Sequence, residues 1–278
     1  MAELEEKTLL RFPLPNCPAY EKLLKETWES TEYKKRFAAY KDFIDQIQPK
    51  TGFKPEEMTL RQLAKLQDTL FCEEIHKFPL PEWVNTDVKS KLEELSLLSM
   101  QAPFKIYKQE EKSRLQGGVL VNAILKNISQ NAQHISKQQK MIIYSAHDTT
   151  VAALQIALNV FNDKTPPYSA CHIFELYEDN GTYQIGMFYR NDSAAEPYEI
   201  TLPDCTAPCP LERFIQLTSN IISNDWEKEC KINNSPDKHK GVITGLAITI
   251  CVLFLIIFGL LYFLCKRISI RLNNFERI

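Results

Sequence analysis

Apolar side chains recur every three or four residues through the first half of the chain, between charged and amide side chains. This spacing puts the apolar side chains on one face of a helix and predicts a mainly helical region over residues 19–126. Pro49 and Gly52 interrupt the first helical run. Thr59 followed by Gln62 fits the capping box of a second helix. We interpret the leucines and aromatics of this region as core.

Two further helices follow from the same spacing. Thr86 is the expected cap of a helix whose apolar side chains again fall on one face. Another helix is expected over 110–126, where Gly117 and Gly118 carry no side chain that would hold a neighbour away. The glycine pair therefore predicts a close approach between this helix and another element.

The pattern changes in the second half of the chain. An apolar, β-branched run over 141–144 predicts a buried strand, and 151–160 has the spacing of a helix. Two alternating runs, HIFELYED and TYQIGMFYR, flank Asn180 and Gly181, and an Asn-Gly pair between such runs is the strongest short signal for a hairpin. We therefore expect residues 141–230 to form an α/β region.

The longest apolar run lies near the C-terminus. Residues 241–265, GVITGLAITICVLFLIIFGLLYFLC, hold no charged side chain over 25 positions, which is long enough to cross a bilayer as one tilted helix. Lys266, Arg267 and Arg271 follow directly. The positive-inside rule therefore predicts a short cytoplasmic tail over 266–278.

The remaining body, residues 1–235, has the composition of a lumenal or extracellular domain. Four N-x-S/T sequons and an even set of six cysteines before the apolar run suit glycosylation and disulfides. The chain has 33 basic and 35 acidic side chains, a balance that gives no reason to expect nucleic acid as a partner. The sequons are at Asn127, Asn180, Asn191 and Asn233, and the cysteines are Cys17, Cys72, Cys171, Cys205, Cys209 and Cys230.

The first residues conflict with such a location, because MAELEEKTLLRF is acidic and broken by charges, unlike a secretory signal peptide. Two topologies therefore stay open. In the first, the chain is a single-pass type I membrane protein of lysosomes, endosomes or the plasma membrane, with a lumenal or extracellular body. In the second, translation starts at Met1 and the chain is tail-anchored, with a cytosolic body, unmodified sequons and unpaired cysteines.

The candidate chemistry lies between the predicted strand and the helix that follows it. His147 and Asp148 stand side by side there, and strand-to-helix turns at the carboxyl edge of an α/β sheet are common ligand sites. A purely structural interpretation is also open, in which Asp148 caps the helix and His147 has no role. The local pattern does not decide between the two.

Several blocks of sequence resemble the vertebrate histidine acid phosphatases. YSAHDTTVAALQIAL, PPYSACHIFELY, MFYRND and CPLERF resemble the C-terminal half of these enzymes. RFPLPNCP, YKDFI, FCEEIHKFPLPEW and EKSRLQGGVLVNAIL match the same family in the same order, so that the resemblance covers residues 8–230. It implies an α/β fold: the C-terminal portion of the histidine phosphatase (phosphoglycerate-mutase-like) sheet with a mostly helical subdomain, followed by one transmembrane helix.

The resemblance also implies a reaction, the hydrolysis of phosphate monoesters through a phosphohistidine intermediate. In this family a histidine attacks phosphorus, arginines hold the phosphoryl oxygens, and a protonated aspartate gives its proton to the leaving alkoxide. Carried onto this chain, Asp148 is the proton donor and His147 contacts the phosphate through its ring N–H. The chemistry requires no metal and no other cofactor. The implied substrates are small phosphomonoesters or phosphoproteins, and homodimers are common in the family.

The other half of that active site has no match in the chain. The family's nucleophile lies in an early Arg-His-Gly-x-Arg motif, whereas none of the five histidines here follows an arginine. We therefore expect a chain that begins inside the family pattern and is inactive alone, with activity belonging to a longer product. The alternative is a non-catalytic, membrane-anchored glycoprotein that serves as an interaction module on a phosphatase scaffold.

A disulfide pattern is implied as well, although six cysteines alone allow fifteen pairings. One of the implied bridges joins the start of the helical region to the end of the body. By family matching, Cys17 pairs with Cys230, Cys72 with Cys171, and Cys205 with Cys209.

Overall fold

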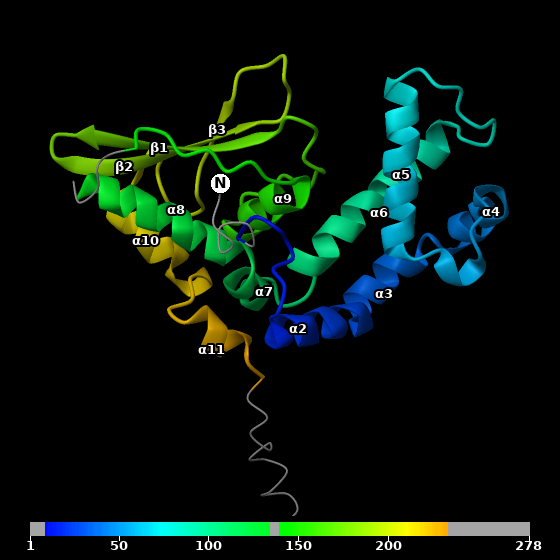
Figure 1. Cartoon of the computed structure of the whole chain (residues 1–278), viewed down its shortest axis with the longest axis horizontal. Helices are drawn as coiled ribbons and strands as arrows, with labels where there is room; N and C mark the ends of the chain where they lie inside the picture. Colours follow the sequence, from blue (N-terminus) through cyan, green and yellow to red (C-terminus); the bar gives the residue numbers. More distant parts are fainter. Residues whose placement is uncertain (1–8, 134–138, 233–278) are drawn as a thin grey trace, which may run out of the picture. The chain divides into compact units, whose positions relative to one another are not determined.

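The computed structural model describes residues 9–133 and 139–232 (Figure 1). Met1–Lys231 forms one compact unit, and a second unit, Ile232–Ile278, lies almost wholly outside the described residues. The predicted membrane span and cytoplasmic tail, residues 241–278, belong to that second unit and also lie outside them. Within the described ranges, no helix combines the length and the apolar character needed to cross a membrane.

Helices fill most of residues 19–126, as the spacing of apolar side chains predicts. Figure 1 shows them from blue α2 through cyan α5 to green α8. The helices are α2 (Pro18–Glu29), α3 (Thr31–Ala38), α4 (Lys41–Thr51), η1 (Pro55–Glu57), α5 (Leu60–Ile75), α6 (Thr86–Phe104), α7 (Gln109–Leu115), α8 (Gly117–Ala132), α9 (Asp148–Ala157), α10 (Leu211–Thr218), η2 (Ser219–Ile221) and α11 (Trp226–Cys230).

Side-chain caps were predicted from the sequence at the starts of α5 and α6. Thr59 precedes α5, and its hydroxyl accepts a hydrogen bond from the backbone N–H of Gln62 at 3.3 Å, which confirms the predicted cap. The predicted cap of α6 is wrong by one residue. Asn85, not Thr86, has the extended backbone of a cap, and its Oδ1 accepts from the N–H of Val88 at 3.0 Å. Thr86 is already the first helical residue, so it does not occupy the cap position.

The helix predicted over 110–126 is two helices, α7 and α8, because the chain breaks at Gln116. The backbone of Gln116 leaves the helical region, with φ −125° and ψ −101°. Its Oε1 accepts a hydrogen bond from the backbone N–H of Leu14 at 2.6 Å. The break therefore turns a side chain inward, where it satisfies a buried donor that lies far away in the sequence.

Gly117 and Gly118 open α8, at the point where it comes closest to two other elements. A Cβ on Gly117 would lie 2.1 Å from the carbonyl oxygen of Ala153 in α9, and one on Gly118 would lie 1.8 Å from that of Ile221 in η2. No side chain fits at such distances. The close packing predicted from the glycine pair is confirmed.

One hairpin forms the centre of the sheet. β1 (Cys171–Asp179) and β2 (Thr182–Arg190) pair antiparallel along their whole length. Asn180 and Gly181 between them both have positive φ, 51° and 78°. This is the geometry of a type I′ turn, and it confirms the predicted hairpin.

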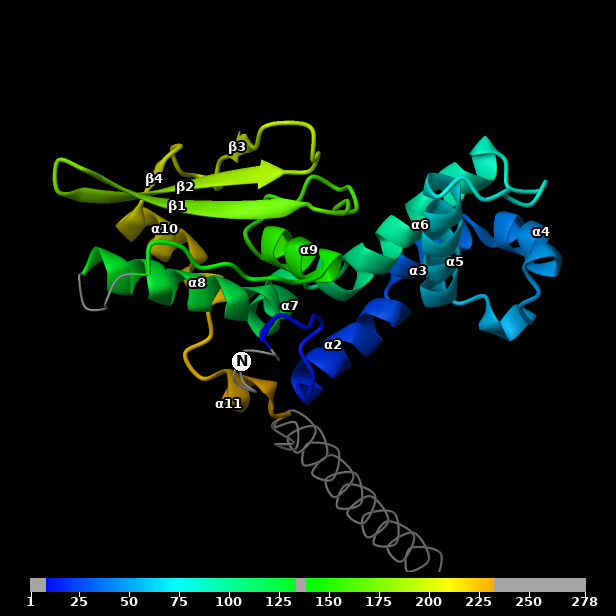
Figure 2. The same cartoon turned by 45° about the horizontal axis from the view of Figure 1, so that its top comes forward.

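Two short strands extend the sheet. β3 (Tyr198–Ile200) and β4 (Cys209–Pro210) both pair antiparallel with β2, so β1 is an edge of the four-stranded sheet. One face of the sheet packs on α8, α9 and α10, which lie beneath it in Figure 2. Ile185 and Met187 of β2 lie in the core between these layers. A second cluster of buried side chains joins α4, α5 and α6.

The strand predicted over 141–144 is not formed. This segment runs as a stretched coil over α8 in Figure 2, and it pairs with no strand of the described chain. Met141 and Ile143 are 76% and 79% exposed. Tyr144 is half-buried, and its hydroxyl accepts a hydrogen bond from Nδ2 of Asn127 in α8 at 2.7 Å. A strand exists only beside a partner that shares its hydrogen bonds, so an apolar pattern alone does not make one.

Two of the three implied disulfides are present. Cys17, directly before α2, is bonded to Cys230 at the end of α11, and these two cysteines lie in a small buried cluster of their own. Cys205 is bonded to Cys209 and closes a short loop before β4. The first bridge spans 213 residues and joins the two ends of the compact unit.

The third implied pair, Cys72 with Cys171, is wrong for this structure, because both are free thiols. The sulfur of Cys72 lies 3.9 Å from the hydroxyl of Tyr168. The sulfur of Cys171 is directed to the carbonyl oxygen of the next residue, His172, at 4.0 Å. Each of the two sulfur atoms thus contacts a different polar group, and they are not bonded to each other.

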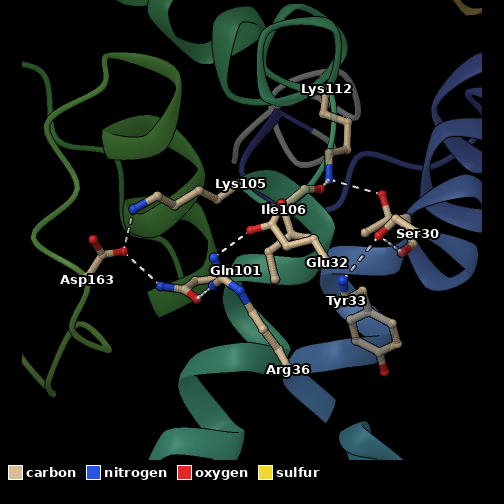
Figure 3. A network of polar contacts seen from close by, with 10 residues as sticks. Ser30, Glu32, Tyr33, Arg36, Gln101, Lys105, Ile106, Lys112 and Asp163 are labelled. Atoms are coloured by element: carbon tan, nitrogen blue, oxygen red, sulfur yellow. Dashed lines mark hydrogen bonds and ion pairs between the residues drawn. The ribbon is translucent and has the colours of Figure 1, made fainter. Parts of the chain in front are cut away.

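One lysine is completely buried. The ammonium group of Lys112 in α7 donates to Oγ1 of Thr27 at 3.2 Å and to the carbonyl oxygen of Ala102 at 2.9 Å. It also donates to the carbonyl oxygen of Ile106, as Figure 3 shows. Ala102 lies in the last turn of α6 and Ile106 lies two residues beyond the end of that helix, where carbonyl groups lack helical partners and favour a cation. Lys112 therefore joins α2, α6 and α7 at one point.

Burial lowers the pKa of the Lys112 ammonium from 10.5 to about 7, although Glu32 and Glu111 act in the opposite direction. Below about pH 7 the folded and unfolded states both carry the proton, so this lysine adds no pH dependence there. Between about pH 7 and 10.5 the unfolded state keeps a proton that the folded state has released. Stability therefore rises with pH across this window.

We expect the free energy of unfolding to rise between about pH 7 and about pH 9, by at most about 1.4 kcal/mol per pH unit from Lys112. Lys112→Met is expected to remove this rise because it removes the titrating group. Urea denaturation of both proteins at the two pH values measures the difference. Lys91→Met, which replaces a partly exposed lysine of α6, is the control and should keep the original slope. Equal slopes for the original chain and Lys112→Met would contradict the prediction.

Candidate active site

The His147–Asp148 turn lies at the start of α9. His147 is the residue before the helix, with extended backbone at φ −109° and ψ 165°, and Asp148 is the first helical residue. The cap position thus belongs to His147, so the interpretation of Asp148 as the cap is wrong. Oδ1 of Asp148 accepts a hydrogen bond from the N–H of Thr149 at 2.7 Å. Both His147 and Asp148 are exposed, which leaves their side chains accessible to a ligand.

A buried hydroxyl holds this turn in place. Oγ1 of Thr150 donates to the carbonyl oxygen of Leu10 at 2.6 Å and accepts from the N–H of His147 at 3.4 Å. The bond to Leu10 ties the turn to the start of the described chain. Thr150 was not singled out from the sequence. Its position three residues after His147 could have indicated its role, because a hydroxyl at that position can accept a hydrogen bond from the backbone N–H of the residue before a helix.

The turn opens on a broad groove with a volume of about 2840 Å³. The walls come from α5, α6, α8, the segment over 139–151 and the chain over 163–178. His147 and Asp148 both lie on this surface. A pocket for a small ligand usually has a volume of about 300–1,000 Å³, so the groove is larger than a phosphomonoester requires.

Arginine occurs once among the described residues that line the groove, as Arg61 of α5. Guanidinium groups bind phosphoryl oxygens in pairs and neutralise them, so a phosphate site needs several. Carboxylates such as Asp163 and Glu175 lie on the same surface, and their charge repels a phosphate. The groove therefore does not by itself hold the arginine cradle that the resemblance implies.

Polar contacts fix one rim of the groove (Figure 3). Oδ1 of Asp163 accepts from Nε2 of Gln101 at 2.7 Å and from Nζ of Lys105 at 2.5 Å. Oε1 of Gln101 in turn accepts from Nη1 of Arg36 at 3.2 Å. These bonds connect α3, α6 and the loop after α9, so Arg36 and Lys105 are engaged in holding the fold.

A pair of polar side chains, His172 of β1 and Gln155 of α9, lies beside the groove, with Gln155 buried and His172 partly buried. Nδ1 of His172 is 3.4 Å from Nε2 of Gln155. Nε2 of His172 and Oε1 of Gln155 are buried without a hydrogen-bond partner among the described residues. The imidazole also packs on Phe174, at 4.7 Å between ring centres, and burial lowers the pKa of His172 to about 4. Neither polar residue was singled out from the sequence, because their burial comes from packing between distant elements.

The remaining histidines do not supply the expected nucleophile motif. His76 ends α5, His172 is buried around its ring nitrogens, and neither follows an arginine. His134 and His239 lie outside the described residues. Within the described part of the chain, no group of three or more His, Cys, Asp or Glu side chains is placed to hold a metal ion.

The sequence model of the histidine phosphatase superfamily (branch 2) matches residues 4–190. This match covers more than half of the chain and includes the His147–Asp148 turn. The chain belongs to the histidine phosphatase superfamily. The family predicted from the sequence blocks is thus confirmed, and the helices and antiparallel sheet described above fit it.

Acid phosphatases are among the relatives of this member of the superfamily. It is 49% identical to prostatic acid phosphatase of Rattus norvegicus over 227 residues, which is 82% of this chain and 59% of the rat protein. It is 47% identical to the Homo sapiens protein of that name over 238 residues, 86% of this chain and 60% of the relative. Lysosomal acid phosphatase of Xenopus laevis is 44% identical over 263 residues, 94% of this chain and 60% of the relative. The chain thus spans about three fifths of the length of the relatives it matches.

Stability in acid is expected to depend on His172. Its pKa falls from 6.5 in the unfolded chain to about 4 in the folded one. A group with a lowered basic pKa contributes stability above about pH 6.5 that is lost as the pH falls toward 4, because the unfolded state then binds the additional proton.

We expect His172→Phe to lose less stability than the original chain between about pH 7 and about pH 4.5, because the variant has no buried imidazole to protonate. The urea midpoint at the two pH values measures this loss. His76→Phe, at the exposed end of α5, is the control and should behave like the original chain. An equal acid loss in His172→Phe and the original chain would contradict the assignment.

Proposed function

We propose that this chain is the proton-donor part of a histidine acid phosphatase that hydrolyses phosphate monoesters through a phosphohistidine intermediate. The observation that carries the proposal is the His147–Asp148 pair, exposed at the start of α9 on the wall of the groove. The acid phosphatase names of the relatives agree with it.

In this proposal Asp148 gives a proton to the leaving alkoxide. An alkoxide is a poor leaving group, so the acid must hold its proton at the working pH, which an acidic medium favours. His147 donates its ring N–H to a phosphoryl oxygen. The buried bonds of Thr150 support both roles, because they fix the backbone of the turn while its side chains stay exposed.

We further propose that the chain is inactive alone. None of its histidines follows an arginine, and Arg61 is the sole arginine among the described residues of the groove. Without a nucleophile and an arginine cradle, a proton donor has no phosphoryl transfer to assist. Activity is then a property of a protein that adds the missing motif.

The alternative proposal is a non-catalytic glycoprotein that uses this scaffold to bind a partner. The broad, arginine-poor groove favours it, because the groove exceeds the size of a small phosphomonoester. Under the main proposal the substrates are small phosphomonoesters or phosphoproteins, and homodimers are the family's common assembly. The lysosomal acid phosphatase relatives support a lysosomal membrane location, with residues 241–265 as the anchor.

A lumenal body would carry glycans, and we propose Asn180 and Asn191 as their sites. Asn180 is exposed in the turn between β1 and β2, and Asn191 directly follows β2. Asn127 fits poorly, because it lies inside α8 and its Nδ2, the atom that would carry the sugar, donates to Tyr144. Asn233 lies outside the described residues.

The glycan proposal predicts unequal effects of two matched substitutions. Thr182→Ala removes the sequon of Asn180 but keeps the Asn-Gly turn, and Ser129→Ala removes the sequon of Asn127. In a chain directed to the secretory pathway, Thr182→Ala should reduce the change in gel mobility that glycosidase treatment causes. Ser129→Ala should leave that change as it is in the original chain. A chain that glycosidase does not shift at all would favour the cytosolic topology.

The activity prediction compares two proteins on a generic aryl phosphate at about pH 5. The chain alone should release no phosphate above background, and a chain extended upstream by a family segment with the Arg-His-Gly motif should be active. Asp148→Ala in the extended protein should lower the turnover number about 100-fold or more, because general acid catalysis contributes at least that much.

Asp42→Ala is the matched control, since Asp42 also lies exposed in the first turn of a helix, α4. Its activity should stay unchanged. Phosphate release by the chain alone, lost on Asp148→Ala, would instead mean that the nucleophile is present among residues 1–278.

A further inference from the structure

The walls of the groove belong to two separate clusters of buried side chains. The sheet cluster lies between the sheet and α8, α9 and α10, and it includes Leu120 and Leu154. The helical cluster joins α4, α5 and α6, and it includes Leu63 and Leu95. α5 and α6 line the groove on the side of the helical cluster, and α8 and residues 139–151 line it on the side of the sheet cluster. The width of the groove therefore depends on how the two clusters are held relative to each other.

One loop, residues 163–170, connects the two clusters along the groove, and we call it the strap. Each of its residues lines the groove. The strap begins shortly after α9 and ends at β1, so both of its ends lead into the sheet cluster, whereas its side chains contact α5 and α6. Pro166 and Pro167 restrict the backbone in its middle. The strap thus has little freedom to stretch between its contacts.

Asp163 anchors the start of the strap to the helical cluster. Its Oδ1 accepts from Nε2 of Gln101, a side chain of α6 that is 7% exposed. Oε1 of Gln101 is occupied by Arg36 of α3, so the amide presents its Nε2 to Asp163, as Figure 3 shows. Loss of Asp163 would leave Nε2 of Gln101 without this acceptor in a buried position, which is costly. The ion pair of Asp163 with Lys105 adds little, because the two side chains are 51% and 33% exposed.

Tyr168 is the second anchor, near the other end of the strap. Its ring stacks on Phe71 of α5, with 6.2 Å between the ring centres and 13° between the planes. Its hydroxyl lies 3.4 Å from Oδ1 of Asp68 and 3.9 Å from the sulfur of Cys72, which both belong to α5. Tyr168 is 70% exposed, so these directed contacts hold it in place, and burial contributes little.

We propose that the strap sets the width of the groove and thereby the size of the leaving group that the site accepts, with Asp163 as its positioning residue. The inference rests on the proposed function, because it assigns the choice of substrate to the groove beside His147 and Asp148. The groove already exceeds the size of a small phosphomonoester, so its width selects among large leaving groups, such as those of phosphoproteins.

α6 is the axis about which the groove would open. It contributes Phe104 to the sheet cluster and Leu95 to the helical cluster, so it belongs to both. A released strap lets the helical cluster rotate about the end of α6 that lies in the sheet cluster, as packed units do about a hinge. Asp163 therefore acts through the position of α5 and α6.

The first test measures the distance between the clusters in the full chain. Nitroxide labels on Thr69→Cys in α5 and Asn122→Cys in α8 report this distance, since both positions are exposed and lie outside the groove lining. The four cysteines outside the two disulfides are replaced by serine, which keeps a polar group beside Tyr168. Pulsed electron spin resonance should give one narrow distribution of distances for this chain.

Substitutions in the labelled chain test the anchors. Asp163→Ala is expected to widen the distribution about twofold or more, because a released unit samples several positions. Tyr168→Ala releases the other anchor and should have the same effect, which keeps the test open if Asp163→Ala does not fold. Asp163→Asn retains an oxygen that accepts from Gln101 and should keep the narrow distribution. Asp45→Ala, which removes an exposed carboxylate paired with Lys41 inside α4, is the control and should also keep it.

The second test uses the protein extended upstream with the Arg-His-Gly segment. Its kcat and KM are measured on a small aryl phosphate and on phosphorylated casein. Asp163→Ala should raise the ratio of kcat/KM for casein to that for the aryl phosphate about threefold or more, through a lower KM for casein. Asp163→Asn should keep the original ratio. A merely structural role of Asp163 would lower kcat for both substrates alike and leave the ratio as it is.

The outcomes separate this inference from the proposed function. A wider distribution together with a raised ratio supports both. A wider distribution with an inactive extended protein supports the control of groove width by the strap and overturns the proposed function, and with it the selection of a leaving group. An unchanged distribution in both Asp163→Ala and Tyr168→Ala overturns the inference, whatever the activity. An unchanged ratio in an active extended protein overturns the role of the strap in substrate choice.

Discussion

The backbone contact of α8 with α9 and η2 is the constraint on which the candidate site depends. Gly117 and Gly118 carry no side chain, so these elements approach to a distance that no other residue allows. This contact fixes α9, and the buried hydroxyl of Thr150 then ties the start of α9 to the first described residues. His147 and Asp148 are thus positioned by backbone and by a neighbouring side chain. Their own side chains remain exposed to the groove.

Features set by neighbouring residues could be predicted from the sequence. Asn180 and Gly181 adopt positive φ at low cost, so the hairpin between them follows from local chemistry. The close packing at the start of α8 could also be predicted from the sequence, because two neighbouring glycines leave no side chain to hold another element away. The strand over 141–144 could not be predicted correctly, because a strand depends on a partner elsewhere in the fold. The burial of Lys112 likewise depends on carbonyl groups at the end of α6.

Some residues of the candidate site could likewise be predicted from the sequence, and others could not. His147 and Asp148 were found through a resemblance between sequence blocks, and the structure adds their geometry and the role of Thr150. The buried pair of Gln155 and His172 could not be found, since the contact joins α9 to β1 and each residue is ordinary in its own segment. The groove is also a product of tertiary structure, with walls from segments that lie more than a hundred residues apart in the sequence.

The disulfide between Cys17 and Cys230 also decides how mechanical tension enters the protein. The chain beyond Lys231 leaves the compact unit directly after Cys230, so a pull from that side reaches the disulfide before it reaches any strand. The covalent bond passes the pull to α2, and the paired hydrogen bonds of Arg114 with Glu229 offer a second path into α7. The sheet and the start of α9 lie inside the loop that the disulfide closes. They are therefore shielded from force applied at the C-terminal side of the body.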